Sequence, residues 1–212
     1  MATIATFRAN IRKDLHDEDA TAYRWTDAAL DRHITRAVNE YSLHAPLEQR
    51  TGLTTTPNSR DLGIAGLANL IDVEAVEWPI GEFPPRRVGF SIWQTTLTMD
   101  VVGAPSAAES ANVYWTRMHT IDVATSTVPA SDEDIVCAGG AAYAALDWTS
   151  FATNRINTGG EDVWGRYKAF ADERLRQFQR ELRRVGRSNM VRQRRLYAPD
   201  TAPAVEQNRV YW

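Results

Sequence analysis

The sequence has almost no cysteine, since Cys137 is the only one among 212 residues. A single cysteine cannot form an internal disulfide, and the Ala/Gly-rich stretch around it favours a small core residue over a reactive thiol. No apolar run approaches the roughly 20 residues that span a bilayer. The first residues, Met1-Ala2-Thr3-Ile4, also lack the charged-then-apolar order of a signal peptide. We therefore expect the chain to fold in a reducing cytoplasm.

Catalytic signatures are absent as well. The sequence contains no P-loop, no dinucleotide-binding glycine pattern, no nucleophile elbow and no HExxH motif. The run from His16 to Asp19 could supply metal ligands, but no glycine turn with spaced oxygen ligands follows, so an exposed acidic loop is the favoured interpretation. His33 lies beside Arg32 and is interpreted as a surface histidine. We predict a protein without catalytic, cofactor-binding or metal-binding residues, and not an enzyme.

Charge is distributed unevenly along the chain. Residues 166–195 carry eleven basic and three acidic side chains, a net charge of +8. The first 165 residues carry -10 and the tail from residue 196 carries -1, within a formal total of -3. An acidic body with a basic arm suggests two surfaces that have different partners.

Apolar residues spaced three or four apart predict helices at both ends of the chain. The second helix has the clearest start, because Thr26 is expected to cap it and Trp25 to pack on Leu30 as a hydrophobic staple. The predicted helices cover residues 4–15, 26–46, 131–151 and 161–185.

The last two predicted helices have distinct compositions. Ser131 and Asp134 approximate a capping box at the start of the third. Gly139 and Gly140 in its centre each cost about 1 kcal/mol relative to alanine, so we expect another backbone to approach closely there. Gly186 is the expected end of the fourth helix. Its apolar positions have heptad-like spacing: Trp164, Tyr167, Ala171, Leu175, Phe178, Leu182 and Val185.

Glycine, proline and short β-rich runs replace the helical period in the middle of the chain. Strands are predicted over residues 49–56, 60–64, 71–78, 87–93, 96–101 and 112–118. The predicted fold class is α+β: a bundle of about four helices with an inserted small antiparallel β-sheet lobe and an extended C-terminal tail. The predicted domains are a helical core (1–47 and 119–186), the β-rich lobe (48–118) and an extended C-terminal arm (187–212).

The arginine-rich helix and the segment after it contain the candidate interface residues. Clustered arginines suit phosphates or an acidic protein surface, although a solvated helix face is the alternative. Because the acidic body would repel a DNA duplex, we favour contact with an acidic neighbour, which sets orientation more than affinity. The inter-subunit basic face is assigned to Arg176, Arg180, Arg183 and Arg184.

Arginine and aromatic residues dominate interface energetics, so the C-terminal segment is predicted to anchor on another molecule, with a frayed end as the alternative. The residues assigned to this contact are Arg187, Arg192, Arg194, Arg195, Leu196, Tyr197, Val210, Tyr211 and Trp212.

The order of these features resembles the head–tail adaptor, or connector, proteins of tailed bacteriophages. The resemblance covers most of the chain and rests on packing and capping patterns. These are Tyr23-Arg24-Trp25-Thr26-Asp27 with Leu30, Ile34 and Ala37, the Ser131-capped helix containing Tyr143 and Trp148, the Arg-rich helix, and Arg194-Arg195-Leu196-Tyr197. The block 48–118 is larger than minimal helical adaptors require.

The resemblance implies a structural protein of the virion neck, made in the bacterial host cytoplasm. Members of this family form rings, commonly of twelve copies, beneath the portal protein. The ring extends the DNA channel, helps to retain packaged DNA and provides a platform for the next neck or tail protein. The C-terminal helix and tail dock on the portal, a role that we transfer to residues 187–197, and to Tyr211 and Trp212. DNA would pass without sequence-specific binding, and no membrane or cofactor is implied.

Three other functions stay open at this point. The chain could be a nucleic-acid-binding module that uses the Arg-rich helix. It could be a different neck or tail-completion subunit in which the β-rich block makes the main contacts. It could also be a small hydrolase built on acidic residues, although no motif supports one.

Overall fold

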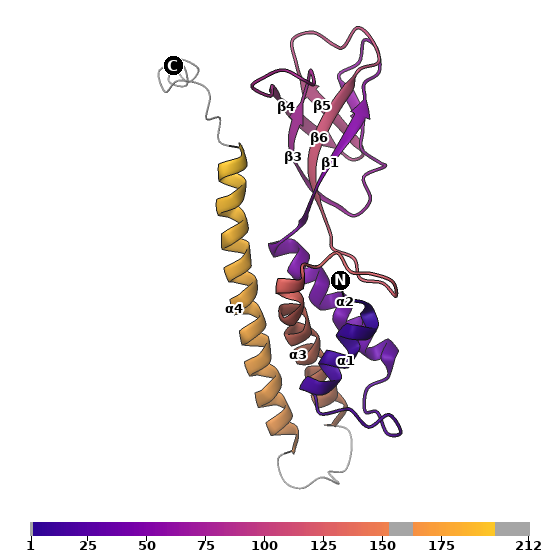
Figure 1. The fold of residues 1–212 in the computed structure, drawn as a ribbon, viewed down its shortest axis with the longest axis vertical. Helices are drawn as coiled ribbons and strands as arrows, with labels where there is room; N and C mark the ends of the chain where they lie inside the picture. Colours follow the sequence, from indigo (N-terminus) through magenta and orange to yellow (C-terminus); the bar gives the residue numbers. More distant parts are fainter. Residues whose placement is uncertain (1, 153–162, 198–212) are drawn as a thin grey trace. The chain divides into compact units, whose positions relative to one another are not determined.

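The computed structural model describes residues 2–152 and 163–197, which form two compact units (Figure 1). The helical unit contains Met1–Pro46 and His119–Asn189, and the sheet unit contains Leu47–Met118 together with Met190–Trp212. Together the described residues form four α-helices and a six-stranded antiparallel sheet, which confirms the predicted α+β class.

The helical unit is a bundle with one continuous apolar core. Its elements are α1 (Ile4–Asp14), α2 (Asp27–His44), the 3₁₀ turn η1 (Ala130–Asp132) and α3 (Glu133–Ala152). The last helix, α4 (Val163–Tyr197), belongs to this unit through Asn189. Thr26 caps α2 as predicted, because its hydroxyl accepts a hydrogen bond from the Ala29 amide at 3.2 Å. In the described ranges no helix combines the length and the apolar character that crossing a membrane requires.

Trp25 is a central residue of this core. Its side chain is 4% exposed, and its indole Nε1 donates a hydrogen bond to the Ala144 carbonyl of α3 at 3.1 Å. Its ring meets the ring of Trp148 edge-on, with the centroids 5.8 Å apart. Trp25 thus joins the start of α2 to the second half of α3.

The acidic loop after α1 is not fully solvated, contrary to the sequence interpretation. Asp17 is buried and binds the buried guanidinium of Arg12 at 2.7 Å. The other groups that Asp17 accepts from are the backbone amides of Arg24 and Trp25. The loop therefore folds back on α1 around one ion pair, because a buried charge is tolerated only with a partner and hydrogen bonds.

His33 was also misassigned, since it is 4% exposed rather than a surface residue. Its Nε2 lies 3.7 Å from a carboxylate oxygen of Asp147 on α3. Burial lowers the pKa of His33, and the nearby Asp147 carboxylate offsets part of that effect. The predicted polar side of α2 at this position is thus covered by α3.

The sheet unit has the strand order β1-β6-β3-β4-β5-β2, with every neighbouring pair antiparallel (Figure 1). Its strands lie within three residues of the predicted boundaries: β1 (Leu47–Thr54), β2 (Asp61–Gly63), β3 (Leu70–Glu77), β4 (Arg87–Trp93), β5 (Thr96–Asp100) and β6 (Ser110–Arg117).

The sheet is curled because its two halves join through a short pairing. Between β3 and β4 only Val76↔Val88 and Glu77↔Arg87 are paired. Two register shifts in β3 add further bending and account for the imperfect alternation of its sequence. The halves enclose a second apolar core, whose fully buried members include Leu62, Leu97, Met99, Val76 and Val113.

Two predicted helix boundaries are wrong. Ser131 does not cap α3, because it lies inside the 3₁₀ turn that precedes this helix. The fourth helix does not end near Val185 but continues to Tyr197, so residues 187–197 of the predicted extended arm are helical. Gly186 alone costs only about 1 kcal/mol in a helix, and no proline follows before Pro199.

The substitution Trp25→Ala is expected to lower the free energy of unfolding by roughly 3 kcal/mol or more. It removes a buried ring and leaves the Ala144 carbonyl without its donor. Urea unfolding followed by circular dichroism measures the change. Trp93→Ala is the matched control, because Trp93 is 80% exposed and should unfold like the wild type. An unchanged midpoint for Trp25→Ala would contradict its place in the core.

Candidate interaction surface on the last helix

The helix α4 uses one face to pack on the rest of the helical unit. Its 35 residues span about 52 Å at 1.5 Å per residue. Ala171, Phe178 and Leu182 on this face are buried. Other apolar residues of the same face pack around them, partly buried: Tyr167, Phe170, Leu175 and Val185. The predicted apolar stripe is thus the inner face of α4 through Val185.

The small residues at the centre of α3 make room for this packing. A Cβ atom added to Gly139 would lie 2.9 Å from the ring of Phe178 and 3.0 Å from the Cβ of Ala37. A Cβ atom at Gly140 would lie 2.5 Å from the Cδ1 of Ile11. The close approach expected at these glycines is therefore real, but side chains of α4, α2 and α1 make it, not a backbone.

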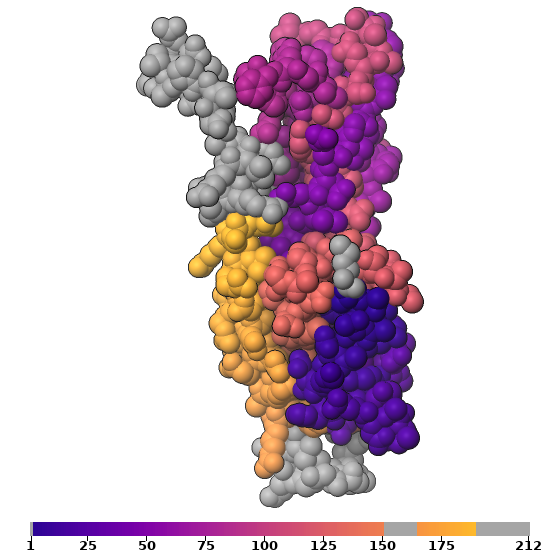
Figure 2. Space-filling model, viewed as in Figure 1, coloured from indigo at the N-terminus to yellow at the C-terminus, as the bar shows by residue number. Residues whose placement is uncertain are grey.

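The opposite face of α4 carries a row of arginines. Arg176, Arg180, Arg183, Arg184 and Arg187 are all exposed. Their spacing of three or four residues places them on one side of the helix, about half a turn away from Phe178 and Leu182. Figure 2 shows α4, in orange to yellow, as a strip on the surface of the helical unit. We call these five residues the arginine row.

The charge of the arginine row is compensated only in part. Arg176 and Arg180 lie 3.4 and 3.3 Å from the carboxylate of Glu173. Arg184 lies 2.7 Å from Glu181. These pairs are exposed, and exposed pairs contribute about 0–1 kcal/mol, so they can open when a partner approaches.

Arg183 and Arg187 form no ion pair with any residue in the described part of the chain. Arg183 donates a hydrogen bond to the Gln179 carbonyl of its own helix. The row therefore retains a net positive charge along a face that contributes nothing to the apolar core.

The remaining predicted interface residues divide into two groups. The backbone of Arg192, Arg194, Arg195, Leu196 and Tyr197 belongs to α4. Val210, Tyr211 and Trp212 lie outside the described residues.

Several titratable side chains of the helical unit are buried in its core and have hydrogen-bond partners there. Burial raises the pKa of Cys137 to about 12, as expected for a core cysteine. Burial also raises the pKa of Tyr41, whose hydroxyl donates to Asp132 at 2.6 Å. Tyr143 behaves likewise, donating to Glu40 at 2.6 Å. Within the described ranges no group of three or more His, Cys, Asp or Glu side chains is placed to hold a metal ion.

Sequence reasoning missed these polar pairs. Tyr41 with Asp132 and Tyr143 with Glu40 are separated by 91 and 103 residues. A helical period places such a residue on a face but does not identify its distant partner. Arg12 with Asp17 is local, and the only available signal was a basic residue five positions before an acidic one.

Comparison with solved structures finds a similarity at low sequence identity. No protein-family model matches the chain, and no curated protein matches it. A solved structure described as the neck of an empty GTA particle computed with C6 symmetry is similar at 15% sequence identity and a TM-score of 0.30. The match covers 67% of this chain and 77% of that chain.

The substitution Gly139→Ala is expected to destabilise the protein by about 1–3 kcal/mol, although alanine favours helices. The added methyl group would overlap the Phe178 ring and so push α4 away from α3. Thermal unfolding measures the loss. Gly66→Ala is a control, because a Cβ atom there meets no atom within 4 Å. A Gly139→Ala protein as stable as wild type would show that α4 does not pack as described.

Proposed function

We propose that this chain is a structural subunit of a tailed-phage neck, a head–tail adaptor that acts by assembly and not by catalysis. The observation that carries the proposal is the two-faced helix α4. Its apolar face is used within the chain, and its other face offers a long row of arginines. The resemblance noted in the sequence supplies the context in which such a face would find partners.

The charge division supports contacts between unlike surfaces. Residues 1–165 carry -10, whereas residues 166–195 carry +8. A ring requires each copy to present two different surfaces to its neighbours. We assign the basic one to Arg176, Arg180, Arg183 and Arg184, which would face the acidic body of the next copy. Twelve copies is the number that the resemblance suggests.

The end of α4 and the residues after it are the proposed contact with the portal protein. The residues assigned to this contact are Arg187, Arg192, Arg194, Arg195, Leu196, Tyr197, Val210, Tyr211 and Trp212. Among the α4 side chains that the structure describes, which run to Asn189, Val185 is the last that packs in the helical core. The ring would extend the DNA channel, help to retain the genome, and receive the next neck or tail protein.

The arginine row also favours a second candidate, a nucleic-acid-binding module. Such a module would hold a DNA duplex as a monomer, and its affinity would fall steeply with salt because phosphate contacts release counterions. Fluorescence anisotropy with a labelled duplex at several salt concentrations separates the two candidates. An adaptor would show no tight duplex binding as a monomer, since its acidic body repels phosphates.

Deleting residues 196–212 should leave a folded subunit that no longer joins the portal. The deletion removes none of the core residues that the described side chains show, so the melting temperature should stay close to that of wild type. Co-sedimentation with purified portal rings measures the binding. A truncated protein that still binds the portal normally would contradict the assigned role of this segment.

Reversing two charges of the arginine row should weaken assembly without unfolding the subunit. Arg183→Glu with Arg187→Glu breaks no ion pair with a described residue, so stability should change by only about 0.5 kcal/mol. Association, measured by light scattering with and without portal, should fall about tenfold or more because like charges would meet. Lys13→Glu with Arg86→Glu is the control for net charge, since both residues are exposed outside α4 and neither forms an ion pair with a described residue. Equal loss in both double variants would argue against a role for the row.

A further inference from the structure

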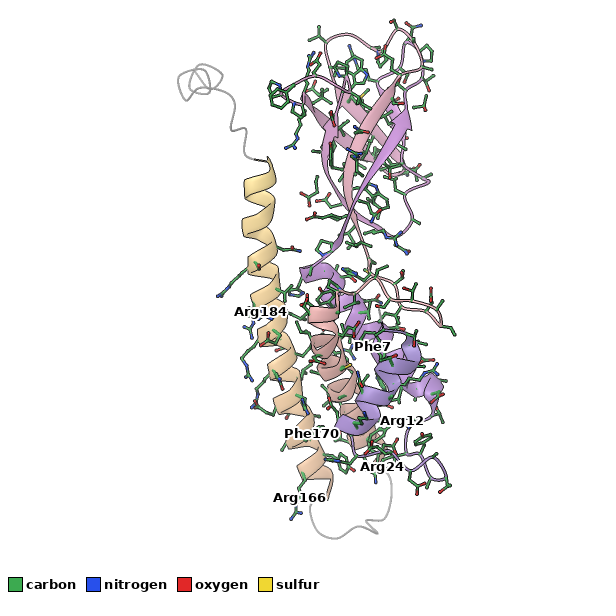
Figure 3. All side chains as sticks on the ribbon, in the orientation of Figure 1. Phe7, Arg12, Arg24, Arg166, Phe170 and Arg184 are labelled. Carbon is green, nitrogen blue, oxygen red and sulfur yellow. The ribbon has the colours of Figure 1, made fainter. Side chains whose placement is uncertain are left out.

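A pocket lies at the end of the helical unit where α4 begins. It has a volume of about 290 Å³ and lies between the end of α1, the loop before α2, and the first turns of α4. Its lining includes Leu15, Arg24, Arg166 and Phe170. Figure 3 shows the last three of these gathered at that end of the unit. This pocket is part of neither the apolar core nor the arginine row.

Arg24 is held in position at the pocket by aromatic rings. Its guanidinium carbon lies 4.9 Å from the ring centroid of Trp148, 5.3 Å from Tyr167 and 5.7 Å from Trp25. It also donates a hydrogen bond to the Tyr167 hydroxyl. A guanidinium fixed in this way loses little entropy when it binds a planar anion.

The other lining residues define the chemistry of a ligand. Arg166 adds a second, exposed guanidinium, and Leu15 and Phe170 add apolar surface. Asp14 also lines the pocket, but Arg174 lies 3.7 Å from its carboxylate and offsets its charge. The pocket therefore suits a carboxylate that is directly followed by a large apolar side chain.

The sheet unit exposes one such pair, Glu82 and Phe83, in the loop between β3 and β4. Phe83 is 93% exposed, which is unusual for so large an apolar side chain. Glu82 is exposed and forms no hydrogen bond or ion pair with another described residue. The Glu82 carboxylate is complementary to the two guanidiniums of the pocket, and the Phe83 ring is complementary to its apolar side chains.

Other exposed apolar side chains fit the pocket less well. Trp93 and Val102 have no acidic residue next to them. Val123 follows Asp122, but the Asp122 carboxylate already accepts hydrogen bonds from two backbone amides, those of Ala124 and Thr125, at 2.7 Å each. Among these exposed apolar side chains, Phe83 with Glu82 therefore fits the pocket best in charge and in ring size.

The loop that presents this pair is constrained before it binds. The amide of Trp78 donates to the carbonyl of Arg86 at 3.1 Å and closes the loop at its base. Pro79, Pro84 and Pro85 fix their own φ angles within it. Docking such a loop costs less conformational entropy than ordering a flexible segment.

We infer that the Glu82–Phe83 loop of one copy docks into the Arg24–Arg166 pocket of another copy. The carboxylate lies between the two guanidiniums, and the ring packs on Leu15 and Phe170. The contact joins two different surfaces, so it propagates from copy to copy and can close into a ring. The inference rests on the proposed self-assembly and names one of its contacts, separate from the arginine row.

Charge exchange between two variants tests this contact. Glu82→Arg and Arg166→Glu each place like charges at every contact, so each variant alone should self-associate at least about tenfold more weakly than wild type. In an equimolar mixture, the altered, basic loop of the first variant meets the altered, acidic pocket of the second, and the unchanged loop meets the unchanged pocket. Sedimentation velocity should therefore show association restored in the mixture alone.

Two further variants control for ring packing and for folding. Phe83→Ala should weaken self-association about tenfold, whereas Trp93→Ala, which removes another exposed ring, should leave it unchanged. Circular dichroism should show wild-type melting for every variant, because the altered side chains are exposed.

Three results would contradict the proposed contact between the Glu82–Phe83 loop and the pocket. Single variants that associate like wild type would show that the pair does not meet the pocket. Folded variants whose mixture regains nothing would exclude a contact between copies. A wild-type chain that stays monomeric at every concentration would also refute it. Portal binding of the wild type tests the proposed function separately, so failure of this contact would leave that function standing.

Discussion

The helical unit depends on the small-residue surface at the centre of α3. Gly139 and Gly140 leave space for Phe178 from α4 and Ile11 from α1, and Ala37 of α2 lies at the same place. Three helices thus converge on two residues that have no side chain. The cost of about 1 kcal/mol for each helical glycine is offset by the burial of these larger side chains. The buried pair of Arg12 and Asp17 adds a polar anchor that fixes the loop leading to Trp25.

This packing determines which side chains of α4 stay exposed and could contact a partner. Its apolar residues through Val185 are used inside the unit, so the face left outside is dominated by arginine. A partner must therefore be recognised mainly through charge and hydrogen bonds, which give orientation and register more than raw affinity.

Local patterns were sufficient to predict most elements of the fold. Helical spacing located all four helices, and turn residues located the six strands, because these signals arise from neighbours in sequence. The end of α4 was missed because Gly186 was interpreted as a stop, although one glycine costs only about 1 kcal/mol in a helix and the residues after it all accept helical angles. The burial of His33 and Asp17, and the pairing of Tyr41 with Asp132, depend on distant residues and have no local signal. The row Arg176–Arg187 could be placed on one face from sequence, but the pocket at Arg24 and Arg166 could not, because it joins residues more than a hundred positions apart.

We propose that the outer face of α4 meets another protein. Electron cryo-microscopy of the purified chain mixed with its portal protein tests it most directly. We expect a closed ring of copies in which the arginine row of each copy lies against a neighbouring protein surface. A chain that remains solitary beside the portal, or that assembles with the arginine row facing solvent, would contradict it.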